Sequence, residues 1–311
     1  MTQVVDKNRV PGRAAVAALG WWSAHRWLIL RRLTQALFLA LFLIGPLAGI
    51  WVVKGTLASS LTLDVLPLTD PLMALQSLIA GNVLEVSGLV GAATLFLFYA
   101  LIGGRVYCSW FCPINPISDL ASWLRARLGW RRSGVHLPRQ LRLMVLAGAL
   151  VAAAVTGTLA WEYLNPISIV QRALVFGTFF TGGIAWMVLL GVFLLELVGG
   201  NRPWCSHLCP VGAFYGLVGK KSVLRVVATH RERCDDCRDC YQVCPEAHVI
   251  NPALKPHSPT DTAVIQHADC TNCGRCIDVC PETVFQFASR FTRSGTGPST
   301  GSAEKPDRKA A

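Results

Sequence analysis

The chain has 311 residues, of which 52% are hydrophobic and only 15% carry a charge. A soluble globular domain has about 25% charged residues, so the composition argues against an ordinary water-soluble protein and indicates several segments that never meet water. The net charge of +11 does not indicate a nucleic-acid partner, because the basic residues flank apolar runs instead of forming a stripe with interleaved aromatic residues.

Four apolar segments are long enough to cross a bilayer, which takes about 20 mostly apolar residues. They predict an all-α membrane domain of four transmembrane helices within residues 33–225, preceded by a basic segment, 1–32. The predicted spans are residues 33–53, 86–104, 141–161 and 174–198. That one or two of them are buried helices of a soluble protein is the less favoured alternative, because all four reach spanning length.

The positions of the Lys and Arg residues predict the orientation of these spans. Basic residues are concentrated in 1–32 and in 105–142, whereas Lys54 is the only one in 54–85 and Arg172 the only one in 162–173. Basic loops stay on the cytoplasmic side of a membrane. We therefore expect a multi-pass protein in the lipid of the bacterial inner membrane, with both termini in the cytoplasm.

Two similar cysteine motifs follow the second and the fourth span. Residues 107–113 read Tyr-Cys-Ser-Trp-Phe-Cys-Pro, and residues 204–210 read Trp-Cys-Ser-His-Leu-Cys-Pro. Each half of the membrane domain is thus expected to be one copy of a repeated unit that ends in C-x3-C-P. The four thiols could hold a metal or cluster, act as a redox dithiol, or only mark turns at span ends, and their spacing does not decide between these roles. These cysteines are Cys108, Cys112, Cys205 and Cys209.

The strongest signal is a pair of C-x2-C-x2-C-x3-C-P runs within residues 226–291, the pattern of bacterial two-cluster ferredoxins. They predict a small α+β ferredoxin-like domain, on the cytoplasmic side, with two [4Fe–4S] clusters. In such runs three cysteines surround one cluster and the fourth binds the other, while structural zinc prefers paired C-x2-C motifs. One predicted ligand set is Cys234, Cys237, Cys240 and Cys280, and the other is Cys270, Cys273, Cys276 and Cys244.

Other cofactor classes lack their signatures, and the last segment, 292–311, has the composition of a disordered tail. All seven histidines lie outside the four spans and no C-x2-C-H motif occurs, so no haem is expected. No Gly-rich phosphate loop precedes a helix, so neither flavin nor nucleotide is expected. Five carboxylates near span ends are candidates for accepting protons from a quinol, although solvated loop positions are their more common role. They are Asp64, Asp70, Glu85, Glu162 and Glu196.

The stretches between these motifs resemble one family, NapH, the ferredoxin-type membrane subunit of periplasmic nitrate reductase systems. The likeness covers nearly the whole chain apart from its two ends. The cysteine motifs alone are shared with NosR-like and CcoG-like polyferredoxins. The additional matching stretches are Gly20-Trp21-Trp22, His25-Arg26-Trp27-Leu28, Leu30-Arg31-Arg32, Pro67-Leu68-Thr69-Asp70-Pro71-Leu72-Met73, Leu75-Gln76-Ser77-Leu78, Asn115-Pro116, Gly157-Thr158-Leu159, Trp161-Glu162 and Asn165-Pro166.

The resemblance implies a function in respiration. It indicates the iron–sulfur electron-transfer subunit of a quinol dehydrogenase, with quinol as the substrate and no catalytic residue identified. The implied partners are a NapG-like periplasmic ferredoxin, a membrane-anchored cytochrome and the periplasmic nitrate reductase. Two alternatives stay open, a CcoG-like metal-handling assembly factor that uses the membrane-proximal cysteines, and a redox sensor.

Overall fold

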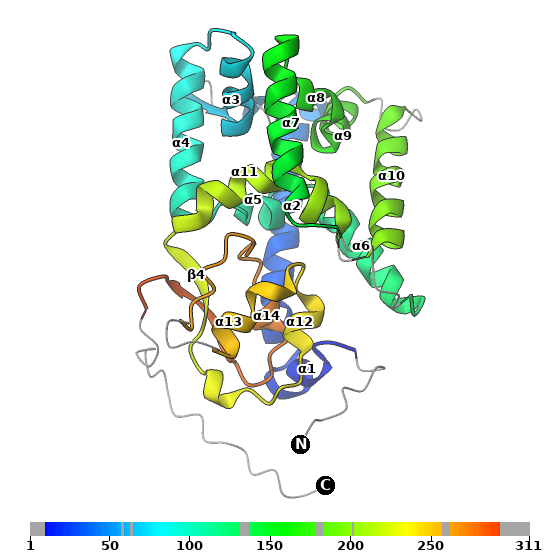
Figure 1. The fold of residues 1–311 in the computed structure, drawn as a ribbon. Coiled ribbons are helices and arrows are strands. Elements are labelled where there is room, and N and C mark those ends of the chain that lie inside the picture. Colours follow the sequence, from blue (N-terminus) through cyan, green and yellow to red (C-terminus); the bar gives the residue numbers. More distant parts are fainter. Residues whose placement is uncertain are drawn as a thin grey trace, which may run out of the picture.

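The computed structural model describes residues 10–56, 59–62, 65–130, 137–177, 183–200, 202–256 and 262–292. Figure 1 shows a helical part above a cysteine-rich part, with helix α2 running from one into the other. The helical part contains α2 (Trp21–Ala48), α3 (Pro71–Ile79), α4 (Val86–Ile102), α5 (Val106–Trp110), α6 (Asn115–Arg127), α7 (Leu141–Thr156), α8 (Ala160–Leu164), α9 (Pro166–Val175), α10 (Ile184–Gly199), the π-helix η2 (Trp204–Leu208) and α11 (Pro210–Val218).

The cysteine-rich part combines short helices with a two-stranded sheet, as expected for a small α+β domain. Strands β4 and β5 are antiparallel, from the pair Leu224 and Ser289 to the pair Ala228 and Phe285. Asp278 joins this part to α2, because its carboxylate accepts backbone N–H groups of that helix at 3.2 and 2.9 Å. The elements are α1 (Arg13–Leu19), η3 (Gly219–Lys221), β4 (Leu224–Ala228), η4 (Arg231–Arg233), α12 (Asp239–Val243), η5 (Ala247–Val249), α13 (Asn251–Leu254), α14 (Arg275–Asp278) and β5 (Phe285–Ser289).

The helices do not coincide with the predicted spans. Helix α2 starts at Trp21 instead of residue 33 and ends where Gly49, with φ 73°, closes its last turn. Within the described residues it is the one helix long and apolar enough to cross a membrane, over Trp21–Pro46. Helices α4, α7 and α10 have 17, 16 and 16 residues. They are shorter than predicted, because Gly103 and Gly157 end α4 and α7 and because residues up to 175 belong to the separate helix α9.

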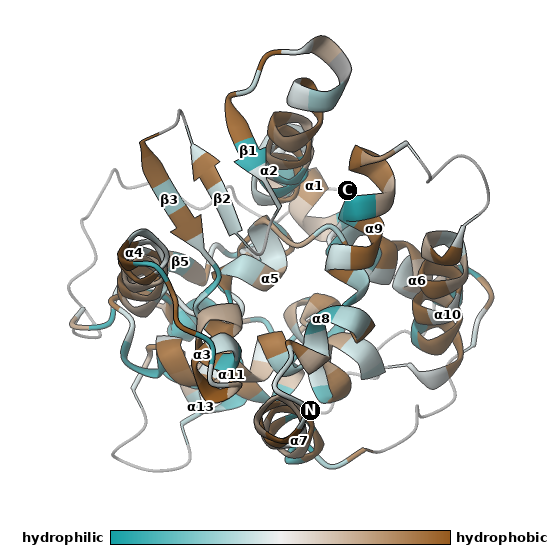
Figure 2. Ribbon diagram, turned by 90° about the horizontal axis from the view of Figure 1, so that it is seen from above, coloured by the Kyte–Doolittle hydropathy of each residue, from teal (hydrophilic) through white to brown (hydrophobic). Residues whose placement is uncertain are grey.

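The outer faces of α4, α7 and α10 are apolar. Figure 2 views these helices along their axes and shows hydrophobic residues around them. A helix on the surface of a soluble protein has a polar face toward water, which these helices lack. Their large exposed hydrophobic residues are Val86, Leu89, Val90, Phe96, Leu97, Phe98 and Leu101 on α4, Leu143, Met144, Val151 and Val155 on α7, and Ile184, Trp186, Met187, Leu190, Leu194, Leu195 and Val198 on α10.

The prediction that the membrane domain is all-α is wrong for one segment. Strands β1 (Val53–Gly55), β2 (Ser59–Thr62) and β3 (Leu66–Thr69) form an antiparallel sheet in that order. Each strand has only three or four residues, among which Val53, Thr62 and Thr69 are of the types that favour strands. Strand β3 packs on α4 at Gly91, where an added Cβ would lie 2.6 Å from the carbonyl oxygen of Pro67. A glycine thus permits this close contact.

The two halves also share a pair of short helices that the sequence prediction did not include. Helices α3 and α9 each begin with proline and follow an N-cap residue, Asp70 or Asn165, whose side chain accepts a backbone N–H of the first turn. Six residues after the cap each helix carries a glutamine, Gln76 or Gln171, and both are at most 1% exposed. This equivalence supports two copies of one unit.

The junction below α4 depends on two glycines. An added Cβ on Gly104 would lie 1.6 Å from the carbonyl oxygen of Tyr215, and one on Gly219 would lie 2.0 Å from the backbone nitrogen of Gly104. We expect Gly104→Ala to lower the free energy of unfolding by about 1–3 kcal/mol, the usual cost of overpacking. Gly148→Ala is the matched control, because an added Cβ there meets no atom within 4 Å. Denaturation in detergent would measure both, and equal effects would contradict this account.

Candidate functional site

Two cavities in the cysteine-rich part are each lined by four cysteines, three from one run and the fourth from the other. Each contains about 360 Å³ of space outside protein atoms, part of which is open to solvent. An exchange of the fourth cysteine would require this mixed origin, and cluster binding by these two sets stays a prediction. The first cavity, called site 1, is lined by Cys234, Cys237, Cys240 and Cys280, and the second, site 2, by Cys244, Cys270, Cys273 and Cys276.

The loops around the two sites have the same backbone shape. Asp236 and Asn272 precede the second cysteine of each run and have φ of 58° and 48°. Arg238 and Gly274 follow that cysteine and have φ of 61° and 72°. These left-handed residues turn the chain around the cavity. Asp, Asn and Gly adopt this conformation readily, so only Arg238 carries a side chain that disfavours it.

The chemistry of the donor atoms fits an iron–sulfur group. Burial raises the pKa of seven of the eight thiols, among them Cys270 and Cys240 with pKa values of about 11 and 12. Thiolates are the form of cysteine that binds metal. Positively charged iron ions are therefore needed to keep eight buried thiols ionised together. Only Cys273 has a lowered pKa: burial raises it, but Arg275 and Arg31 outweigh this.

Arg31 of α2 is the clearest unpaired cation beside site 2. It is 1% exposed, and its Nε and Nη1 atoms have no hydrogen-bond partner among the described residues. A buried guanidinium without partners is costly. An anionic cluster on Cys273 and its three companions would supply the missing negative charge, so this orphaned group fits the proposed cofactor.

Asp119 of α6 connects the helical part with the loop of site 2. Its carboxylate forms ion pairs with Arg32 of α2, with Arg202 at 2.5 Å and with Arg275 of α14 at 2.6 Å. Burial alone would raise the pKa of Asp119, but Arg275, Arg202 and Arg32 hold it far below its usual range. The carboxylate is therefore ionised at neutral pH.

A second ionic network joins the two parts on the other side of site 2. Arg105, at the start of α5, donates to the carboxylate of Glu246 at 3.0 Å and to the backbone oxygen of Asp269 at 2.9 Å. Arg142 of α7 pairs with the Asp269 carboxylate. Glu246 and Asp269 both line site 2, so this cavity lies directly below the helical part.

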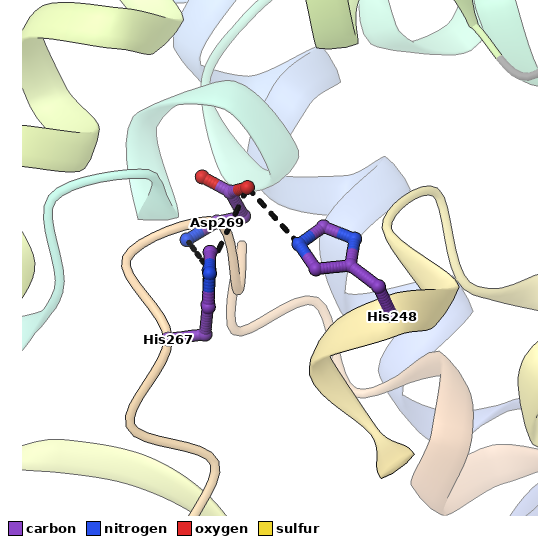
Figure 3. Close-up of side chains that lie close together, drawn as sticks. All are labelled: His248, His267 and Asp269. Carbon is purple, nitrogen blue, oxygen red and sulfur yellow. Dashed lines mark hydrogen bonds and ion pairs between the residues drawn. The ribbon is translucent and has the colours of Figure 1, made fainter. Parts of the chain in front are cut away.

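His248, His267 and Asp269 form a cluster of potential metal ligands beside site 2 (Figure 3). The Nε2 atom of His248 lies 3.1 Å from Oδ2 of Asp269, and Nδ1 of His267 lies 3.5 Å from the same oxygen. The pKa of Asp269 is raised by burial but lowered further by His248, Arg142 and Arg105. Because two guanidinium groups already neutralise this carboxylate, we interpret the cluster as part of the ionic network.

Three of the five predicted carboxylates make specific bonds inside the protein, so the solvated-loop interpretation is wrong for them. Tyr215 donates its hydroxyl to Asp70 at 3.1 Å. Glu162 pairs with an arginine of α9 at 3.0 Å, and Glu196 accepts the backbone N–H of Cys205 at 3.3 Å. The other two are Glu85, which is exposed, and Asp64, which lies outside the described residues.

Two family models match the chain. One, described as a 4Fe-4S dicluster domain, matches residues 233–284. The other, described as a 4Fe-4S binding domain, matches residues 84–131 and 173–227. The dicluster match covers all eight cysteines of sites 1 and 2.

Curated proteins named MauN and NapH are similar over most of the chain. The methylamine utilization ferredoxin-type protein MauN of Paracoccus denitrificans is 54% identical over 89% of this chain and 95% of its own length. The MauN protein of Methylorubrum extorquens is 54% identical over 77% and 82%, respectively. The ferredoxin-type protein NapH of Escherichia coli is 46% identical over 93% and 98%. No solved structure matches the chain.

Proposed function

Because this chain belongs to the family of ferredoxin-type proteins that includes MauN and NapH, we propose that it is the iron–sulfur electron-transfer subunit of a membrane-bound quinol dehydrogenase. The observation that carries the proposal is the position of site 2. Its loops are bonded to the helical part through Arg105, Arg142 and Asp119. These ion pairs hold site 2 against the helical part, where electrons from a quinol would enter.

The chain's residues hold and tune two clusters. Site 1 and site 2 would each bind one [4Fe–4S] cluster, which takes up and gives out single electrons. Arg31 and Arg275 compensate the negative charge at site 2, and apolar side chains such as Val226 and Ile265 exclude water there. Site 1 has exposed neighbours, Asp235 and Asp236 among them, so its cluster would lie closer to water.

The helical part would span the bacterial inner membrane with α2, α4, α7 and α10. The apolar outer faces of α4, α7 and α10 support this arrangement, as does the length of α2. The distribution of basic residues favours a cytoplasmic location for the cysteine-rich part and for both termini. Three of these helices are shorter than about 20 residues, which a bilayer accommodates by local thinning.

The quinol needs a proton acceptor within reach of the lipid. Asp70 is the carboxylate that the geometry favours, because its hydroxyl donor Tyr215 belongs to a continuous group of rings. Tyr99 and Tyr107 lie with ring centroids 4.8 and 5.3 Å from that of Tyr215, and Tyr107 directly precedes Cys108. In this proposal Asp70 receives a proton and electrons pass toward the cysteines, while a NapG-like ferredoxin, a membrane-anchored cytochrome and a periplasmic nitrate reductase are the partners of the same electron-transfer system.

Methylamine utilization is the second candidate for the pathway that the chain serves. The observation that favours it is the identity of 54% to two MauN proteins, compared with 46% to NapH of Escherichia coli. Deleting the gene would separate the candidates, since growth with nitrate as electron acceptor fails in one case and growth on methylamine in the other. Lost copper handling with both forms of growth intact would instead favour the metal-handling alternative.

The quinol proposal predicts that membranes containing the chain show reduced [4Fe–4S] signals when a quinol is added. Low-temperature EPR would measure these signals, and Asp70→Asn is expected to slow the reduction at least tenfold, since a lost proton acceptor typically costs about 10²-fold or more. Glu85→Gln is the matched control, because this carboxylate is exposed. Clusters that stay oxidised even with a periplasmic ferredoxin partner present would contradict the proposal.

A further inference from the structure

The two C-x3-C-P loops of the helical part, which sites 1 and 2 do not use, have the same backbone geometry. The N–H of Cys112 donates to the carbonyl of Tyr107 at 3.0 Å, and the N–H of Cys209 donates to that of Trp204 at 2.9 Å. Both hydrogen bonds span five residues, which is the π-type turn often found at functional sites. Two distant segments therefore present their cysteines in the same way.

These loops bring their cysteines together in the interior. Gly212 lies beside both loops. An added Cβ on this residue would be 3.9 Å from Sγ of Cys108 in the earlier loop and 3.5 Å from the carbonyl oxygen of Cys205 in the later loop. The hydroxyl of Ser118 lies 3.4 Å from Sγ of Cys205. Cys112 lies in the hydrophobic core of the helical part, and Cys108 and Cys209 pack against that core. The two pairs thus form one group, in which Cys112 is buried and the other three cysteines are partly buried.

The second cysteine of the later loop has the same extended backbone conformation as the fourth cysteine of the first ferredoxin-type run. Cys209 has φ −74° and ψ 111°, and Cys244 of site 2 has φ −75° and ψ 126°. A following proline imposes this extended conformation, and the earlier loop has the same Cys112-Pro113 dipeptide. The chain thus repeats, in its helical part, the Cys-Pro ending that it uses at sites 1 and 2.

The earlier loop is bonded directly to the loop of site 2. The hydroxyl of Ser109, between the two cysteines of its motif, donates to the carbonyl of Thr271 at 2.7 Å. The indole N–H of Trp110 donates to the carbonyl of Asn272 at 3.0 Å. Arg105 lies between the two groups and donates to the carbonyl of Cys205 at 3.3 Å as well as to Glu246. These bonds place the C-x3-C-P loops next to site 2, which is useful for electron transfer. A zinc ion has no redox chemistry, so it would not make use of this proximity.

We propose that Cys108, Cys112, Cys205 and Cys209 hold a third [4Fe–4S] cluster, located between the membrane helices and site 2. Four thiolates from two like loops complete the ligand set of a cubane, and the buried Arg105 offsets part of its negative charge. The 4Fe-4S binding domain match has two segments, 84–131 and 173–227, and each contains one of the loops.

This inference rests on the proposed function, because the electrons at the third site come from the quinol. The step itself is a one-electron transfer in which the third site is oxidised and site 2 is reduced, and no bond forms or breaks. The cysteines stay bound as thiolates throughout. The third cluster would then carry electrons from the membrane helices to the two ferredoxin-type sites.

The test is the iron and acid-labile sulfide content of the full chain, purified and reconstituted without oxygen. Three clusters require about twelve iron and twelve sulfide per chain, and two require about eight. The variant with Cys108, Cys112, Cys205 and Cys209 all replaced by Ser is expected to hold about eight and to keep the EPR signals of sites 1 and 2. Ser206→Ala, which removes a hydroxyl inside the later loop, is the matched control and should keep about twelve.

Native mass spectrometry of the unaltered chain decides the question even if the fourfold variant does not fold. A mass with three cubanes supports the proposal, while two cubanes with four free thiols, or two cubanes with one zinc ion, overturn it. The quinol experiment is independent of this count. About eight iron atoms per chain together with normal reduction by quinol would contradict only the proposal of a third cluster. About twelve iron atoms per chain without reduction by quinol would contradict only the proposed reaction with quinol.

Discussion

Replacing Asp119 with asparagine is expected to loosen the cysteine-rich part from the helices above it and to lower the free energy of unfolding by about 3–5 kcal/mol. Asp119 is the single carboxylate that Arg32, Arg202 and Arg275 share. Asparagine keeps the shape but removes the charge, so three guanidinium groups are left facing one another. Breaking a buried ion pair by removing one partner costs more than the pair itself contributes.

Tryptophan fluorescence during denaturation in detergent would measure this effect, because Trp27 and Trp110 lie at the interface with ring centroids 6.2 Å apart. The exposed carboxylate of Glu232 supplies the control, since Glu232→Gln should change stability by no more than about 0.5 kcal/mol. Adding Arg275→Gln to Asp119→Asn removes one of the unpaired charges and is expected to recover part of the loss. A double variant less stable by the full sum of the two changes would contradict the shared-carboxylate account.

The same network has a defined dependence on pH. The pKa of Asp119 is lowered in the folded protein, so the unfolded chain binds the proton more readily. The contribution to stability is therefore complete above the ordinary aspartate pKa of about 3.9. It is lost as the pH falls toward the folded pKa, so we expect Asp119→Asn to reduce stability at neutral pH and to matter progressively less below pH about 4.

The cysteine sites follow from sequence more directly than any other feature. Each run is local, and its spacing of two residues specifies a loop in which Asp236 and Asn272 take matching left-handed conformations. The exchange of the fourth cysteine needs only the geometry of a cubane. Sequence reasoning could therefore predict the two sets of four cysteines that line sites 1 and 2, because few long-range contacts enter that prediction.

The interface between the two parts could not be predicted in the same way. Asp119 meets residues 87, 83 and 156 positions away, and no periodicity links such distant positions. The helix ends were also missed, because glycines such as Gly157 end a helix inside an apolar run that continues past them. The sheet of β1 to β3 was missed because its strands are too short for a clear alternation.

Arg31→Gln is expected to lower the reduction potential of the cluster at site 2 by on the order of 100 mV. A cluster bound by four thiolates is anionic, and reduction adds one more negative charge. A unit charge about 7 Å away at an effective dielectric constant of about 20 contributes roughly 2 kcal/mol, and 59 mV corresponds to 1.4 kcal/mol for one electron. Arg31 is buried and lowers the pKa of Cys273 against the effect of burial, so its charge is poorly screened there.

A redox titration followed by EPR would resolve the two ferredoxin-type clusters and give an internal control, because Arg31 should leave the potential of site 1 almost unchanged. Arg26→Gln removes the same charge one turn earlier in α2, at an exposed position, and should shift site 2 far less because solvent screens it. Arg31→Lys keeps the positive charge but loses the planar guanidinium donors. We expect the reduction potential of site 2 in this variant to lie close to that of the unaltered protein. Equal shifts at both sites would mean that Arg31 acts through the fold and not through its charge. A shift confined to site 2 and recovered by lysine would instead show that α2, the longest helix among the described residues, controls the potential of the cluster at site 2 through its charge.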